Sequence, residues 1–268
     1  MTKGTENIKK EIQAIVDIYK SGDLSKAELL SKKLIKNYPN SAFLYNLLGL
    51  ILASREKIDE AIESYENGIK ADPKFAMIYN NLGLIYSNYK SDNKKAENFY
   101  KRSIALDQKI AEPHNNLGTL YNGQDKFSHA IKSYKQALLI NPKLAQTHHN
   151  IGNTYITIGN FNEAEKHFKE SIKINQNFSN SHRSLSRLTK YTNSEEGHFK
   201  DLLRIYKKID SKNLEDKSNI SFALGKAYED IKNYDQSYHF YNEANISYKK
   251  KIDFSISLEI EKFKKIKE

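Results

Sequence analysis

Three histidines recur at a constant interval and are the residues of this sequence whose type and spacing could bind a metal. His114, His148 and His182 are each 34 residues apart. A zinc ion needs ligand atoms at about 2 Å, whereas equivalent positions on neighbouring packed helices lie roughly 10 Å apart. Tyr45 and Tyr79 occupy the equivalent upstream positions, where a large side chain would fill space between helices. We therefore expect packing histidines and predict no metal ligand.

The sequence contains no pattern of residues typical of catalysis or of phosphate binding. The 268 residues include no Cys, so disulfides and thiolate nucleophiles are excluded. There is no phosphate-binding Gly-rich loop, because the glycines lie inside predicted helices. Glu195 and Glu196 fall at a predicted helix start, where carboxylates interact with the helix dipole. His148 and His149 are adjacent, so their side chains diverge and we expect a surface pair. We predict no catalytic residue, no cofactor and no enzymatic activity in this chain.

The charge balance is basic but rich in lysine. Lys and Arg total 43 against 33 Asp and Glu, a net charge of +10, and only five of the basic residues are arginine. Surfaces that read phosphate favour arginine. No segment is apolar enough to be a signal peptide or to span a membrane. We expect a cytoplasmic protein without a membrane span, and we do not expect nucleic-acid binding.

The glycines reveal an internal repeat. Leu-Gly pairs end at Gly49, Gly83 and Gly118, and Ile151-Gly152 follows, with steps of 34, 35 and 34 residues. We number each unit so that this glycine is slot eight. Three further slots then hold a constant type: alanine in slot twenty (Ala61, Ala96, Ala130, Ala164), an aromatic residue in slot twenty-four (Tyr65, Tyr100, Tyr134, Phe168), and Pro or Gln in slot thirty-two (Pro73, Gln108, Pro142, Gln176).

This pattern predicts two antiparallel helices, A and B, in each unit. Small residues in slots eight and twenty allow close backbone approach, so we expect Gly118 to lie against Ala130. The aromatic residue in slot twenty-four is expected to fill the gap beside them. Proline in slot thirty-two ends helix B. A mid-helix glycine costs about 1 kcal/mol in helix propensity, so its recurrence indicates packing. The pattern resembles the tetratricopeptide repeat (TPR) family, which implies an all-α, right-handed superhelical solenoid of antiparallel helix pairs.

The repeat pattern extends beyond the four regular units. The N-terminal unit has Ile15 in slot eight, and Ser186 replaces the glycine in a degenerate unit whose extra length predicts a helix near residues 194–208. We predict repeats or repeat-like units at 8–41, 42–75, 76–110, 111–144, 145–178, 179–217 and 218–245. A capping helix at 246–268 follows, with Ile252, Ile256, Ile260 and Phe263 along one side.

One segment carries a second resemblance. Residues 222–230 read FALGKAYED and are followed by Tyr234-Asp235 and Asn245, with Ser184 to Ser186 and Lys190-Tyr191 upstream. This resembles the helical arm that precedes the catalytic domain in bacterial TPR–sulfotransferase fusions. The resemblance implies an association with a sulfotransferase, but the phosphosulfate-binding loop of that family is not in this sequence, so no catalytic residue is assigned.

The predicted concave surface is lined by helix A and is rich in asparagine. Side-chain amides both donate and accept hydrogen bonds, so a row of them could bind the backbone of an extended peptide. The row resembles the asparagine ladder of O-linked GlcNAc transferase. The same amides could instead join neighbouring helices. We predict a peptide-binding groove that contains Asn46, Asn80, Asn81, Asn115, Asn116, His149, Asn150, Asn153, Arg183 and Arg187.

The predicted function is a protein–protein interaction scaffold that binds a peptide or a partner protein, with a sulfotransferase-targeting arm as its most specific form. Two alternatives stay open: a non-catalytic subunit or remnant of a sulfotransferase, and a basic adaptor for nucleic acid or a membrane surface. Exposed lysines on the predicted B helices count against the nucleic-acid alternative, because a phosphate track needs basic groups inside the groove. The sequence has no pattern that specifies an oligomeric state.

Overall fold

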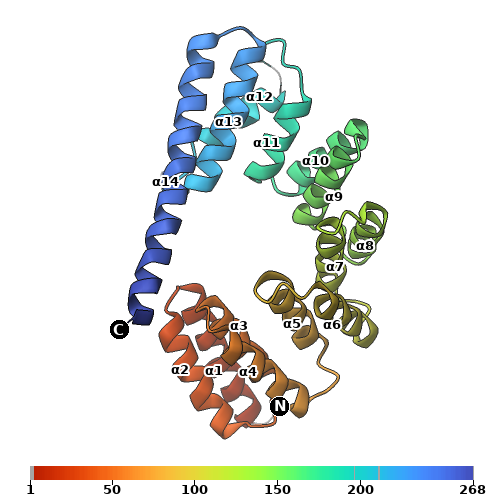
Figure 1. Ribbon diagram of the computed structural model, residues 1–268, viewed down its shortest axis with the longest axis vertical. Helices are drawn as coiled ribbons and strands as arrows, with labels where there is room; N and C mark the ends of the chain where they lie inside the picture. The colour runs from red at the N-terminus through yellow and green to blue at the C-terminus, as the bar shows by residue number, and fades with distance from the viewer. Residues whose placement is uncertain (1–2, 196, 211, 268) are drawn as a thin grey trace. The chain divides into compact units, whose positions relative to one another are not determined.

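The computed structural model describes the backbone of residues 3–195, 197–210 and 212–267, all of whose regular structure is α-helical (Figure 1). The chain divides into two compact units, Met1–Asn141 and Pro142–Glu268. Each unit is described by itself below. Within the described part of the chain, no helix is both long enough and apolar enough to cross a membrane.

The first unit contains four helix pairs. In each pair an A helix is followed by its antiparallel B helix (Figure 1). The pairs are α1 (Lys3–Lys20) with α2 (Leu24–Asn37), α3 (Ala42–Ser54) with α4 (Ile58–Ala71), α5 (Ala76–Asn88) with α6 (Asn93–Leu106), and α7 (Glu112–Asn122) with α8 (Phe127–Ile140). The B helix of each of the first three pairs also contacts the A helix that follows it, so the pairs form one layered stack.

The second unit contains two pairs separated by two shorter helices. The helices are α9 (Ala145–Thr157), α10 (Phe161–Ile174), α11 (Ser179–Leu188), α12 (Gly197–Tyr206), α13 (Leu214–Asp230) and α14 (Tyr234–Lys267). Helix α9 pairs with α10 and α13 pairs with α14, while α11 and α12 both pack on α13. Helix α12 lies within the range predicted for the extra helix of the degenerate repeat.

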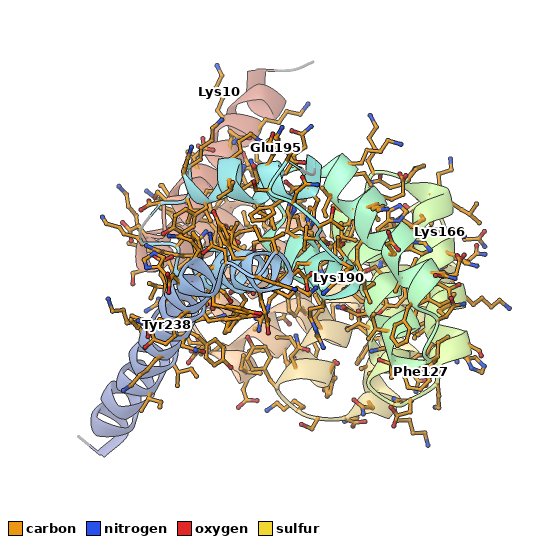
Figure 2. All side chains as sticks on the ribbon, turned by 90° about the horizontal axis from the view of Figure 1, so that it is seen from above. Lys10, Phe127, Lys166, Lys190, Glu195 and Tyr238 are labelled. Atoms are coloured by element: carbon orange, nitrogen blue, oxygen red, sulfur yellow. The ribbon has the colours of Figure 1, made fainter. Side chains whose placement is uncertain are left out.

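Helix α14 runs without a break through Ile246, where the sequence analysis begins a separate capping helix. The 246–267 segment is therefore the continuation of the last B helix. Tyr238 is 74% exposed and projects from α14, as Figure 2 shows. Ile252 and Ile256 are also exposed. The side chains of Ile260 and Phe263 lie outside those that the structure describes.

The repeated glycine is explained by the ring that lies over it. A β-carbon at Gly118 would lie 2.6 Å from Cδ1 and Cε1 of Tyr134, a distance that real β-carbons do not show. The same glycine–aromatic contact recurs at Gly49 with Tyr65, Gly83 with Tyr100, Gly152 with Phe168, and Gly225 with Tyr241. The aromatic residue of slot twenty-four therefore fills the gap beside the small residues, as the sequence pattern predicts. Ala130 is fully buried, but the ring of Tyr134 occupies the space that the missing side chain leaves.

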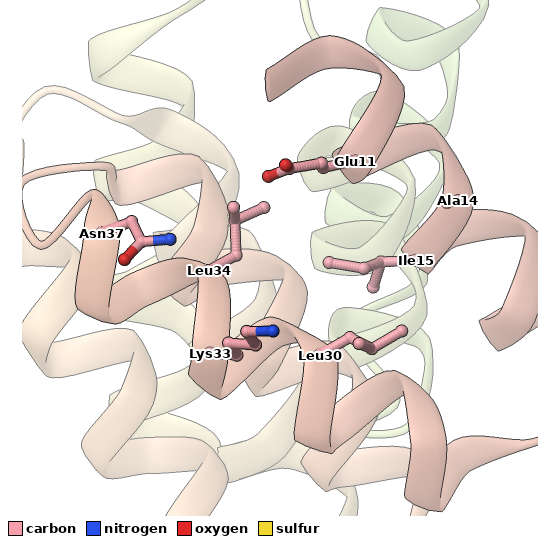
Figure 3. A pocket seen from close by; sticks show the side chains of 7 residues that line it. All are labelled: Glu11, Ala14, Ile15, Leu30, Lys33, Leu34 and Asn37. Atoms are coloured by element: carbon pink, nitrogen blue, oxygen red, sulfur yellow. The ribbon is translucent and has the colours of Figure 1, made fainter. Parts of the chain in front are cut away.

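The first pair lacks both halves of this contact. Ile15 stands in the glycine slot and Ser31 in the aromatic slot, and both are buried. A pocket of about 270 Å³ opens between α1 and α2 (Figure 3). Its lining comprises Glu11, Ala14, Ile15, Leu30, Lys33, Leu34 and Asn37. We attribute the pocket to the absence of the ring that fills this space in the other pairs.

Candidate functional site

Five of the predicted groove asparagines form one chain of hydrogen bonds in the first unit. Asn115 donates to Asn116 (3.4 Å), and Asn116 donates to Asn80 of the neighbouring A helix (2.9 Å). Asn80 donates to Asn81 (3.3 Å), and Asn81 donates to Asn46 (2.8 Å). The chain therefore links α7 to α5 and α5 to α3, because each amide can use its oxygen as acceptor and its nitrogen as donor.

Burial divides these asparagines into two groups. Asn46, Asn80 and Asn81 are 7%, 3% and 5% exposed, so hydrogen bonds to other side chains are their main polar contacts. Asn115 and Asn116 are half-buried and keep part of their surface towards solvent. The sequence left two roles open for these amides, peptide binding and the joining of neighbouring helices. The structure contains the hydrogen bonds that join the helices. Peptide binding through the outer asparagines stays a proposal.

Four of the A helices, α3, α5 and α7 in the first unit and α9 in the second, are almost free of charge. Helices α3, α5 and α9 contain no Asp, Glu, Lys or Arg, and α7 contains only Glu112. The B helices are different, since α4, α6 and α10 each carry several charged residues. Lys166 of α10, for example, is exposed and projects outward (Figure 2). Because the chain is 28% charged overall, the two helix types present different surfaces.

The exposed side of the A helices combines amides with apolar side chains. Phe43 is 43% exposed on α3. Leu50, Met77 and Leu84 are half-buried on α3 and α5, and Thr119 is exposed on α7. In the second unit Asn153 of α9 is exposed, and Asn150 is half-buried and accepts a hydrogen bond from Gln146 (2.8 Å).

His149 is buried, and the expectation of a surface pair with His148 is wrong. Its ring is 8% exposed and lies against Phe168 and Phe178, with ring centroids 5.6 Å and 5.4 Å away. The side chains of His148 and His149 point in different directions, but each is covered by residues of neighbouring helices. His148 is half-buried and contacts His167.

Hydrogen bonds determine which ring nitrogen of His149 carries the proton. Asn153 donates to Nε2 (2.9 Å), so Nδ1 carries the proton and donates to Ser181 Oγ (3.0 Å). Ser181 in turn donates to Ser171 (2.8 Å), whose hydroxyl donates to the carbonyl oxygen of Ala145 (2.8 Å). Burial lowers the pKa of His149 to about 4, which keeps the ring neutral near pH 7.

The remaining predicted site residues lie at the second unit's α11. Arg183 is half-buried, donates to Asn219 Oδ1 (3.1 Å), and lies over the ring of Phe222 at 4.2 Å. Arg187 follows one turn later and is exposed. Asn219 was missed by sequence reasoning, although it stands in slot two when Gly225 is slot eight, and slot two faces the groove in TPR proteins.

The histidines also pair with one another. His148 lies 3.0 Å from His167 (Nδ1 to Nδ1), and His182 lies 3.0 Å from His198 (Nδ1 to Nε2). In the described residues, no group of three or more His, Asp or Glu side chains is arranged to hold a metal ion. Glu195 precedes α12 and pairs with Lys200 (2.6 Å), while Glu196 lies outside the described residues.

Three family models match overlapping segments of the chain. Residues 49–88 match the model described as a TPR repeat, and residues 76–110 and 110–177 match two models described as tetratricopeptide repeats. A search of the curated proteins found no match.

Solved structures share the fold at low sequence identity. The type IV pilus biogenesis factor PilW aligns with a TM-score of 0.63 and 16% identity, over 77% of this chain and 94% of that one. The pilF protein of Pseudomonas aeruginosa gives a TM-score of 0.61 at 17% identity, over 74% and 88% of the two chains. A thermophilic TPR protein of Thermus thermophilus gives 0.58 at 16% identity, over 67% and 97%. Residues 49–177 are therefore tetratricopeptide repeats, and the chain has the all-α fold of a TPR solenoid.

Proposed function

We propose that this chain is a protein-interaction scaffold that binds an extended peptide or a partner protein along its A helices. The observation that carries the proposal is the near-absence of charge on α3, α5 and α7 of the first unit, where Glu112 is the one charged residue, and on α9 of the second unit. Binding must remove water from both partners, and desolvation is least costly where no charge is buried. The cores of protein interfaces are accordingly depleted in charged residues.

The amide chain supports the same proposal through rigidity. Asn116 and Asn81 tie neighbouring A helices together at fixed register. A surface fixed before binding loses less conformational entropy when a ligand binds. The apolar side chains of Phe43, Leu50 and Leu84 would contact ligand side chains, and the half-exposed Asn115, Asn116 and Asn150 would bind ligand backbone. A phosphate backbone finds no basic group on α3, α5, α7 or α9, which argues against nucleic acid as the ligand there.

A photo-crosslinking experiment tests the proposal. Benzoylphenylalanine would replace Phe43, on the A helix α3, and in a matched variant Leu139, which is 75% exposed on the B helix α8. After irradiation in lysate of the source organism, mass spectrometry identifies the crosslinked segment. We expect one recurrent extended segment at Phe43 and none at Leu139. Equal crosslinking at both positions, or none at Phe43, would contradict the proposal.

The sulfotransferase association is a finer form of this proposal. It rests on the resemblance of residues 222–230 and their neighbours to the arm of TPR–sulfotransferase fusions. In the structure this segment is the buried second half of α13, where Leu224 and Ala227 are fully buried. Sequencing of the adjacent reading frames and co-purification of any sulfotransferase they encode would test it. Absence of such an enzyme from both the neighbouring frames and the crosslinked proteins would remove this form and leave the scaffold proposal intact.

A further inference from the structure

Two arginines on α11 stand on one helix face without a carboxylate partner. Arg183 and Arg187 are four residues apart, so their side chains lie one above the other. Helix α11 contains no Asp or Glu. Of the other three arginines, Arg55 pairs with Glu28 and Arg204 pairs with Asp201, while Arg102 lies over the ring of Tyr79. No described carboxylate forms an ion pair with Arg183 or Arg187.

Arg183 is held in place by neutral groups. Asn219 Oδ1 accepts its hydrogen bond, and the ring of Phe222 lies under the guanidinium. Asn219 is oriented by its own donations to Ser179 Oγ (3.2 Å) and Asn180 Oδ1 (2.5 Å), and it is 5% exposed. Asn219 and Phe222 therefore hold the Arg183 guanidinium in place without neutralising its charge.

The carboxylates of the adjoining helices are already engaged. Asp216 accepts from Ser179, Glu215 pairs with Lys251 (2.8 Å), and Glu243 pairs with Lys217 (3.0 Å). Asp230 pairs with Lys190 and Lys226. These carboxylates are thus paired with lysines or a hydroxyl group, and none of them pairs with Arg183 or Arg187.

The local electrostatics disfavour an unpaired charge on Arg183. Burial, and then the neighbouring charge of Arg187, lower the pKa of Arg183, while Tyr248 of α14 raises it. A half-buried cation beside a like charge is unfavourable until a counter-charge arrives.

We propose that Arg183 and Arg187, with Asn219 as positioning residue, bind a carboxylate of the peptide ligand. The planar guanidinium matches the two oxygens of a carboxylate, which forms bidentate, charge-assisted hydrogen bonds. The carboxylate would come from an Asp or Glu side chain or from a free C-terminus. This inference rests on the proposed scaffold function and adds that the ligand is anchored by an acidic group at the second unit.

Fluorescence anisotropy with three labelled decapeptides tests the site. The first alternates Ala with Glu and is amidated, the second alternates Ala with Gln and has a free carboxylate, and the third alternates Ala with Gln and is amidated. We expect the full chain to bind the first or the second at least about tenfold more tightly than the third, as for one hydrogen-bonded charge. Preference for the first identifies side-chain carboxylates, and preference for the second identifies the C-terminus.

Variants locate the effect. Arg183→Gln/Arg187→Gln should reduce binding of the preferred peptide to the level of the third. Lys132→Gln/Lys135→Gln removes the same charge from the exposed side of α8 and should leave binding unchanged. Replacing the half-buried Arg183 could disturb folding, so the single variant Arg187→Gln, at an exposed position, serves as a milder test. Asn219→Asp should also weaken binding, since it places a carboxylate beside Arg183.

Three results would contradict the carboxylate site. Equal affinity for the three peptides, full binding by the arginine variant, or an equal loss in the lysine variant overturns the carboxylate site. Crosslinking at Phe43 decides the scaffold function independently, because that residue belongs to the first unit. A chain that crosslinks a partner at Phe43 but shows no carboxylate preference keeps the scaffold function and loses this site.

Discussion

Gly118 lies directly beneath the ring of Tyr134, with Cδ1 and Cε1 of that ring 2.6 Å from where a β-carbon would stand. We expect Gly118→Ala to destabilise the first unit by about 1–3 kcal/mol, because the ring must shift within a packed core. Gly118→Leu should cost at least as much. The measurement is thermal or urea unfolding followed by circular dichroism.

Gly123 provides the matched control. It follows α7 with φ −67°, and a β-carbon there would approach only backbone oxygens at 3.7 Å. Gly123→Ala should therefore be neutral or slightly stabilising, since it also restricts the unfolded chain. If Gly118→Ala unfolds at the same urea concentration as Gly123→Ala, the ring contact does not control the packing of α7 on α8.

Much of the fold follows from the repeat. The period of 34 or 35 residues, the fixed glycine and alanine slots and the prolines predict paired antiparallel helices, and the structure contains them. The ring beside Gly118 follows from the same pattern, because the aromatic residue of slot twenty-four is expected to fill the gap beside the two small residues. Sequence spacing does not give the closeness of this contact, in which the nearest ring atoms lie 2.6 Å from the position of a β-carbon at Gly118.

The candidate site was predicted less well, for physical reasons. Asn80 and Asn81 have the polarity of surface residues, and only the packing of α3, α5 and α7 shows that their amides meet inside the stack. His149 is similar, because a chain of hydrogen bonds to Ser181 offsets the cost of its burial. Polarity indicates that a group needs a partner, but not whether that partner is water, a ligand or another helix.

Ser31 and Ser103 form a matched pair of buried serines with opposite expectations. Both are 0% exposed, but Ser103 donates to the carbonyl oxygen of Ala76 (2.8 Å), whereas Ser31 Oγ has no partner in the described part of the chain. We expect Ser31→Ala to stabilise the first unit by about 1 kcal/mol and Ser103→Ala to destabilise it by about 1 kcal/mol. Urea unfolding of both variants measures the difference, and equal effects of the same sign would contradict it.

His149 should make the second unit sensitive to acid. Burial lowers its pKa from 6.5 to about 4, so the unfolded chain binds a proton between these values and the folded chain does not. Stability is therefore full above pH 6.5 and falls as the pH drops towards 4. Between pH 7.5 and pH 5 this one ring should account for a loss of about 2 kcal/mol.

His149→Gln isolates the contribution of this ring. The glutamine amide can accept from Asn153 and donate to Ser181, as the ring does, but it does not titrate. Burial also lowers the pKa of His114, His148 and His182, so the variant should retain part of the acid sensitivity. Identical stability losses between pH 7.5 and pH 5 in both proteins would show that His149 is not the titrating group.

The asparagine chain makes a prediction that separates helix bridging from ligand binding. Asn81→Leu removes a donor to Asn46 and an acceptor for Asn80, and leaves both of those buried amides incompletely paired. We expect a loss of about 1–3 kcal/mol in stability. Asn46→Leu/Asn81→Leu removes both ends of one hydrogen bond, so its loss should be smaller than the sum of the single losses, and urea unfolding of the four proteins gives the coupling energy.

A measurement of ligand affinity tests whether the asparagines also bind ligand. In the triple variant Asn81→Ala/Asn116→Ala/Asn150→Ala, the buried Asn81 reports on bridging, while Asn116 and Asn150 keep exposed surface. If the outer amides bind ligand backbone, affinity for the segment crosslinked at Phe43 should fall by about 1–3 kcal/mol, because two neutral hydrogen bonds are lost. The fall should persist below the melting transition, where the variant is folded. A lower melting temperature with unchanged affinity would assign the asparagines to helix bridging alone, and would leave Phe43, Leu50 and Leu84 as the ligand contacts of the first unit.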